Sequence, residues 1–99
     1  MTRFYLNTYH KASEVIVAIC DKELLGCCFQ EGKFRLSVNE EFYGGKLVSI
    51  DEAISALEEA TIGNIVGDKI VKAAIKAGLI HKDGVLHVDG IPHAQRVTL

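Results

Sequence analysis

The sequence contains little of several residue types that mark specialised protein classes. Its 99 residues include one proline and no tryptophan, and its three cysteines have no disulfide or zinc spacing. No apolar run approaches the roughly 18 residues of a membrane helix, and the polar start, Met1-Thr2-Arg3, is unlike a signal peptide. We therefore expect a cytoplasmic protein with reduced thiols and no membrane segment.

The charge balance argues against a protein that binds nucleic acid through its overall positive charge. Eleven basic and thirteen acidic residues give a formal net charge of −2, so the chain lacks the overall positive charge of a typical nucleic-acid binder. An apolar content of 48% argues against disorder. The length predicts one domain, residues 1–99, with a single core.

The first half has the pattern of β-strands. Residues 4–9 alternate between apolar and polar, and residues 15–20 form an unbroken apolar run typical of a central strand. Residues 27–38 predict a hairpin that turns at Glu31-Gly32, with Phe29 opposite Phe34 and Cys27 opposite Leu36. We expect Cys20 and Cys27 in the core and Cys28 at the surface.

The second half predicts two consecutive helices. Ser49-x-x-Glu52 is a capping box before an amphipathic helix whose outer face is acidic. A second helix is expected from about Ile62 to Ala77, with Gly78 as its left-handed cap. Packed on one face of an antiparallel sheet of hairpins, with about five to seven strands, these helices give an α+β fold.

The outer face of the second predicted helix carries the one basic row in the chain. Lys69, Lys72 and Lys76 follow one another at helical spacing, and together with Arg96 they are candidates for contacts with nucleic-acid phosphates. The alternative is an ordinary solvated helix face, partly paired with the acidic helix.

The C-terminal segment contains a six-residue repeat, with histidines at positions 81, 87 and 93 and an Asp-Gly pair in each unit. Two Asp-Gly turns predict a three-stranded meander in which Val88 pairs with Ile91 and His87 with Pro92. His87 then faces away from the other two histidines, and a strand separates His81 from His93, so we expect no metal site. Pro92 predicts a sheet edge or a cleft wall.

The same register sorts the side chains onto two faces. His93 and Gln95 fall on the apolar side and need hydrogen-bonding partners or a pocket. The flexible Gly44-Gly45 pair beside Tyr43 adds Tyr43 and Gly44 as candidates for the pocket lip. The alternative is that the aromatic residues here simply close the end of the core. The remaining residues of the apolar side, expected to face the core, are Leu79, Leu86, Val88, Ile91, Val97 and Leu99.

Three stretches together resemble an archaeal family, domain of unknown function 424. They are residues 41–45 (EFYGG), 60–67 (ATIGNIVG) and 90–95 (GIPHAQ), and the likeness extends over nearly the whole chain. The resemblance implies a small intracellular archaeal protein with no established activity, associated loosely with the translation machinery and RNA. The adjacent cysteines are not a mark of that family.

We rank three functions on this basis. The first is a non-enzymatic module that binds RNA or a translation-related ribonucleoprotein partner through the lysine row. The second is a protein-interaction module or homodimer that uses the free sheet edge and the acidic helix. The third is a small enzyme or ligand-binding protein with a pocket near His93, for which the sequence shows no nucleophile–base pair, no carboxylate pair and no metal motif by spacing. We expect no cofactor.

Overall fold

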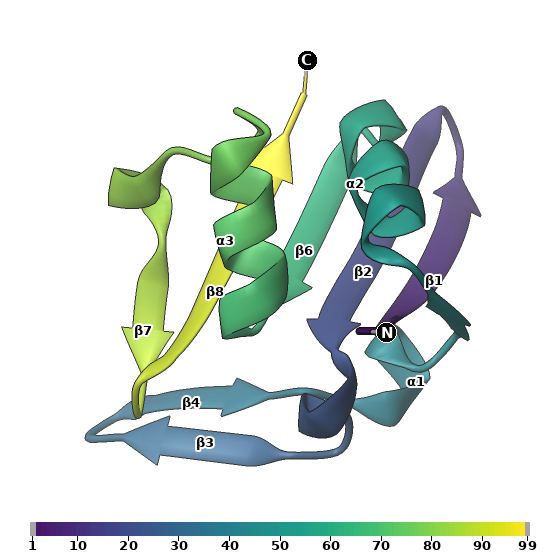
Figure 1. The fold of residues 1–99 in the computed structure, drawn as a ribbon. Coiled ribbons are helices and arrows are strands. Elements are labelled where there is room, and N and C mark those ends of the chain that lie inside the picture. Colours follow the sequence, from purple (N-terminus) through teal and green to yellow (C-terminus); the bar gives the residue numbers. More distant parts are fainter. Residues whose placement is uncertain (1, 99) are drawn as a thin grey trace.

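The computed structural model describes residues 2–98, which form a six-stranded sheet, a separate two-stranded hairpin and three α-helices (Figure 1). The strand order in the large sheet is β5-β1-β2-β6-β8-β7. These features confirm the predicted α+β class. The elements are β1 (Phe4–Lys11), β2 (Glu14–Asp21), β3 (Cys28–Glu31), β4 (Phe34–Ser37), α1 (Glu40–Tyr43), β5 (Lys46–Val48), α2 (Ile50–Glu59), β6 (Ile62–Val66), α3 (Asp68–Lys76), β7 (Leu86–Val88) and β8 (Ile91–Val97).

The sheet separates two apolar clusters. Helices α2 and α3 lie on one face, where they bury side chains such as Leu57 and Ile70 against Ile19 and Ile65 (Figure 1). On the other face, α1 and the β3–β4 hairpin form a smaller cluster. We call these the helix side and the hairpin side of the sheet. The helices thus pack on one face, as expected.

The central position predicted for residues 15–20 is confirmed. β2 pairs antiparallel with β1 along all eight residues and parallel with β6 on its other side. Consecutive residues Val17, Ala18 and Ile19 are all buried, which explains the unbroken apolar run.

The predicted second helix is wrong in its first third. Residues Ile62–Val66 form strand β6, and the helix begins only at Asp68. The apolar residues at 62, 65 and 66 fit helical spacing equally well, but β6 is a strand between β2 and β8 with neighbours on both faces. The two long helices are therefore separated by a strand.

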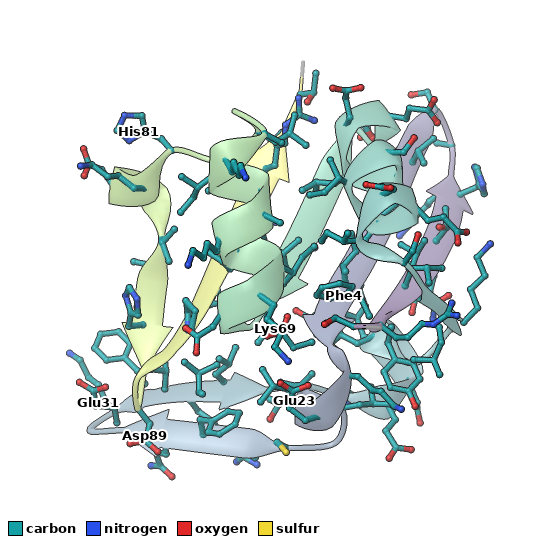
Figure 2. The ribbon with its side chains drawn as sticks, viewed as in Figure 1. Phe4, Glu23, Glu31, Lys69, His81 and Asp89 are labelled. Carbon is teal, nitrogen blue, oxygen red and sulfur yellow. The ribbon has the colours of Figure 1, made fainter. Side chains whose placement is uncertain are left out.

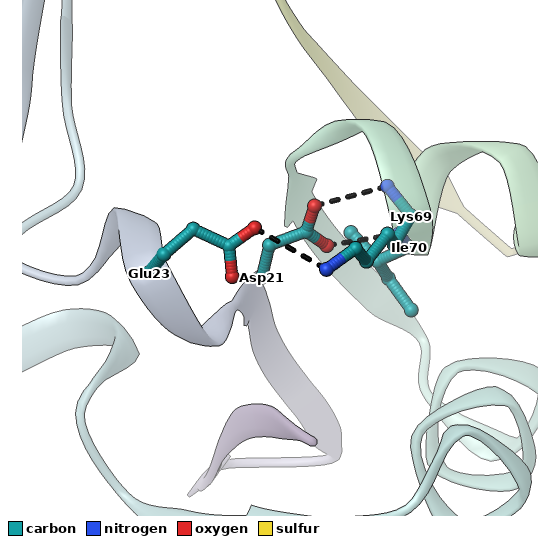
Figure 3. Close-up of polar contacts among 4 residues, drawn as sticks. All are labelled: Asp21, Glu23, Lys69 and Ile70. Carbon is teal, nitrogen blue, oxygen red and sulfur yellow. Dashed lines mark hydrogen bonds and ion pairs between the residues drawn. The ribbon is translucent and has the colours of Figure 1, made fainter. Parts of the chain in front are cut away.

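Helix α3 begins without a side-chain cap of its own. Its N-cap is Gly67, and the buried carboxylate of Asp21, at the end of β2, takes the capping role (Figure 3). Asp21 Oδ2 accepts from the Lys69 N–H at 2.9 Å and Oδ1 from the Ile70 N–H at 3.0 Å. Burial nevertheless raises the pKa of Asp21 above its usual range.

The β3–β4 hairpin turns one residue later than predicted. Phe29 lies opposite Leu36, and Glu31 opposite Phe34, so the turn is Gly32-Lys33. Gly32 is the first residue of the turn and has a φ of +61°, a conformation that favours glycine. Moving the turn by one residue shifts the partner of Phe29 by two residues, from Phe34 to Leu36. Because side chains alternate with a period of two, each side chain stays on its predicted face.

The cysteine predictions are confirmed in part. Cys20 is buried and Cys28 is exposed, as expected. Cys27 is half-buried, outside both apolar clusters, and its thiol contacts the Glu23 carbonyl, so its expected core position is wrong.

The predicted C-terminal meander is one strand too long. Residues Lys82–Gly84 form a turn of 3₁₀ helix in place of a hairpin. The second Asp-Gly turn is confirmed, with positive φ at both Asp89 and Gly90, and the pairs Val88–Ile91 and His87–Pro92 are as predicted.

The predicted core face of the C-terminal segment needs a larger correction. Alternate residues Pro92, Ala94 and Arg96 point to the helix side, whereas Leu86 and Val97 are 64% and 58% exposed on the hairpin side. Among the other residues expected there, Val88 is buried, Leu79 and Ile91 are half-buried, and Leu99 lies outside the described residues. α3 packs on the helix side, where Ile70 and Val71 share the larger apolar cluster with Ala94 of β8.

Candidate functional site

Two hollows flank the C-terminal strands on opposite sides of the sheet. The first lies between α3 and β7 and has a volume of about 490 Å³. We call it the helix-side groove. Its apolar floor includes Val71 and Ile75 of α3 and Pro92 of β8. Pro92 thus borders a cleft, as predicted, although the edge strand is β7 and not its own strand.

Three basic side chains line the helix-side groove. Lys72 comes from α3, Lys82 from the 3₁₀ turn and His87 from β7, and Asp68 is the one acidic lining residue. The ion pairs among residues 2–98 are Lys69–Glu23 and His81–Asp83, so neither groove lysine is neutralised by a described carboxylate. The groove therefore offers cations beside an apolar floor, which suits an anionic ligand.

The other predicted nucleic-acid residues are dispersed. Lys69 lies beside Glu23, with Nζ 3.6 Å from the carboxylate, in a solvent-exposed pair (Figure 2). Lys76 is exposed near the end of α3. Arg96 donates to the carbonyl oxygens of Leu57 and Glu58 at the end of α2, so it stabilises that helix end and does not line the groove.

The second hollow, which we call the sheet-side pocket, lies on the hairpin side and has a volume of about 370 Å³. It contains three of the four predicted pocket residues: Tyr43, His93 and Gln95. Gly44 does not line it; its N–H donates to the Glu40 carbonyl and ends α1. The structure therefore does not bring Gly44 together with the other three residues.

Strand register explains how the polar side chains of this pocket come together. His93 and Gln95 are alternate residues of β8 and point to the same face. Asn64 of β6 lies directly opposite Gln95. Sequence reasoning missed Asn64 because the segment around it was assigned to a helix. It missed Lys82 and His87 because the predicted register placed them on the face away from the core.

Uncharged groups line the sheet-side pocket. Burial lowers the pKa of His93, and a charge on His87 adds to that effect, so the imidazole is neutral at pH 7. Burial raises the pKa of Tyr43 to about 12. No Asp, Glu, Lys or Arg of the described chain lines this pocket.

Two further results bear on the kind of chemistry available. Among residues 2–98, no group of three or more His, Cys, Asp and Glu side chains is placed to hold a metal ion. Within the same residues, no helix combines the length and apolar character needed to cross a membrane.

The family model for proteins of unknown function DUF424 matches residues 9–99. The chain belongs to this family. It is also similar to a crystal structure of an uncharacterised conserved protein from Methanopyrus kandleri, with 28% identity and a TM-score of 0.79. That match covers 98% of this chain and 94% of the other. Among curated proteins, no sequence matches. The predicted family is confirmed, and neither DUF424 nor the neighbour carries an assigned activity.

Proposed function

We propose that this DUF424 protein is a non-enzymatic binding module that takes the sugar-phosphate backbone of RNA, free or within a ribonucleoprotein, in the helix-side groove. The observation that carries the proposal is the convergence of Lys72, Lys82 and His87 from three separate elements on one groove. Phosphate contacts from lysine supply most of the affinity of sequence-independent RNA binding.

The proposal accommodates the net charge of −2. Six of the thirteen acidic residues lie on α1 and α2, and the groove lysines have no described acidic partner within 4.0 Å. A local basic surface can bind phosphate in an acidic protein, but its reach is limited to about 8 Å at physiological salt. We therefore expect weak binding that depends strongly on salt.

Fluorescence anisotropy with a labelled, unstructured RNA strand tests the proposal. With about three phosphate contacts, the logarithm of the association constant should fall with the logarithm of salt with a slope of about −2. Replacing the three basic groove side chains, Lys72, Lys82 and His87, together by alanine should remove measurable binding. The matched control replaces three exposed lysines elsewhere, Lys11, Lys22 and Lys46, and should retain it.

Two results would overturn the proposal. One is the absence of RNA binding at low salt by the wild-type protein. The other is equal loss of binding in the groove variant and the control variant, because that outcome would indicate a response to total charge alone. The homodimer alternative stays a prediction, and light scattering at several protein concentrations measures it.

A further inference from the structure

The sheet-side pocket holds three hydrogen-bonding side chains that the fold does not use. Within residues 2–98, Asn64, His93 and Gln95 make no side-chain hydrogen bond. No fully buried side-chain polar atom of the described chain lacks a partner, so their polar atoms open towards the pocket and solvent. These groups are available to a ligand.

The spacing of the three side chains suits one small, rigid ligand. Asn64 and Gln95 are direct cross-strand partners, whose Cβ atoms lie about 5 Å apart in such pairs. His93 is two residues from Gln95, about 7 Å along the strand. Tyr43 of α1, which is largely buried, and Leu86 of β7, which is exposed, also line the pocket.

The pocket's chemistry selects an uncharged ligand. A charged group would lose hydration there without meeting an opposite charge, since the described lining contains no ionised side chain at pH 7. The two amides each supply an acceptor oxygen and two donor hydrogens, and a neutral imidazole supplies one donor and one acceptor. A matching ligand must therefore present donors and acceptors side by side on a rigid edge.

From these observations we infer that the sheet-side pocket binds a single nucleobase, read at its polar edge by Asn64 and Gln95. Side-chain amides pair with adjacent donor and acceptor atoms on a base edge, and unstacked bases pack against aromatic side chains. A volume of about 370 Å³ is near the lower end of the range for small-molecule pockets and suits one base. This site is on the opposite face of the sheet from the helix-side groove and does not depend on the lysines.

Titration with the four ribonucleosides, followed by amide NMR, tests the inference. Nucleosides carry no phosphate, so failure of the groove proposal leaves this result unaffected. At least one nucleoside should shift the amide signals of residues 64 and 93–95, with a dissociation constant of about 1 mM or tighter. Methyl riboside and inorganic phosphate, the two other parts of a nucleotide, should leave these signals unchanged.

Two substitutions and a matched control assign the contacts. Gln95 is exposed, so Gln95→Ala should keep the fold and weaken nucleoside binding by about tenfold. Asn64→Ala should have a similar effect, and the amide spectrum shows whether the half-buried site still folds. Gln30→Ala changes an exposed strand glutamine outside the pocket and should bind as the wild type does.

The inference is overturned if no nucleoside shifts these amides at concentrations up to about 10 mM. It is equally overturned if Gln95→Ala binds as tightly as Gln30→Ala. A short oligonucleotide that contains the preferred base then shows whether the base comes from an RNA strand or from a free nucleoside. If the oligonucleotide binds more tightly than the nucleoside, and the groove triple variant removes this gain, the natural ligand is an RNA strand. If the two affinities are equal, the natural ligand is a free nucleoside. Both results support a nucleobase as the ligand class.

Discussion

Asp21 occupies the space that a side chain at position 67 would need. A Cβ atom on Gly67 would overlap the carboxyl group of Asp21, and the glycine has a φ of +123°. The glycine thus brings the end of β6 and the start of α3 close enough for Asp21 to accept two backbone hydrogen bonds from the helix. These hydrogen bonds from the start of α3 to Asp21 join the central strand β2 to the helix that borders the helix-side groove.

Replacing Gly67 by alanine should lower the free energy of unfolding by at least about 2 kcal/mol, since it combines backbone strain with displacement of Asp21. Chemical denaturation measures this effect. Gly78→Ala is the matched control, because Gly78 also has a positive φ, of +77°, but a Cβ there would meet nothing within 4 Å. A loss at Gly67 no larger than at Gly78 would contradict the packing argument.

Removing the Asp21 carboxylate should destabilise the protein by about 1–3 kcal/mol, because two N–H groups of α3 lose their acceptor and that of Ile70 is buried. Asp21→Ala tests this by denaturation at pH 7, with Asp51→Ala, at an exposed helix position, as control. Equal stability of the two variants would show that water replaces the carboxylate.

The contribution of Asp21 to the stability of the fold should change with pH in a definite direction. Burial raises the pKa of Asp21, so the folded protein holds this proton more tightly than the unfolded chain does. The resulting stability is fully present below the unfolded pKa of about 3.8 and is lost as the pH rises through the folded pKa. The stability of the wild type relative to Asp21→Asn should therefore decrease as the pH rises above 4. An increase over that range would contradict the pKa direction.

Local signals predicted most of the fold. The pair Asp89-Gly90 set the β7–β8 register residue by residue, since a two-residue turn with two positive φ values permits one alignment. The same pair at Asp83-Gly84 formed a 3₁₀ turn because no strand precedes it. The segment 62–66 was assigned wrongly because a buried parallel strand is defined by its distant partner β2, which no local pattern indicates.

Cys28 should react with thiol reagents faster than the other two cysteines. Its sulfur lies 3.5 Å from Ser37 Oγ and accepts from Arg35 Nε at 3.2 Å, and these hydrogen bonds lower the pKa of the thiol. Burial raises the pKa of Cys20 to about 12. Alkylation of the native protein near pH 7, followed by peptide mass spectrometry, should modify Cys28 first and leave Cys20 protected.

The environment of Cys28 can be tested with one substitution. Arg35→Gln removes the positive charge beside the sulfur and should slow alkylation of Cys28, whereas Lys33→Gln removes an exposed charge from the same hairpin and should not. Equal rates in both variants would show that exposure alone sets the reactivity.

His93 should make the protein less stable in mild acid. Burial lowers its pKa below the unfolded value of about 6.5, so the unfolded chain takes up a proton at a higher pH than the folded protein. Stability is therefore full above pH 6.5 and decreases as the pH falls through the folded pKa. His93→Gln should flatten this part of the stability curve, and His10→Gln, at an exposed position, should not.

The candidate site could be predicted only in part. His93 and Gln95 were predicted because polar residues in an apolar alternation are unusual, and Tyr43 because it adjoins the Gly44-Gly45 pair. The structure brings the three together. Asn64 could be found only by assigning β6 correctly, since it reaches the pocket through its register with Gln95. The lysine row was visible as a helical pattern, but its relation to Lys82 and His87 depends on how the 3₁₀ turn places β7 beside α3.

Because β2 pairs in parallel with β6, it is synthesised well before its second partner strand. Residues 22–61 separate the two strands, so the ribosome must release the chain as far as Val66 before β2 gains its second neighbour. Until then the nascent β1–β2 hairpin presents an apolar strand with one unpaired edge. This interval is when the growing chain is most open to mispairing with other chains, and chaperone contacts at this stage would protect it.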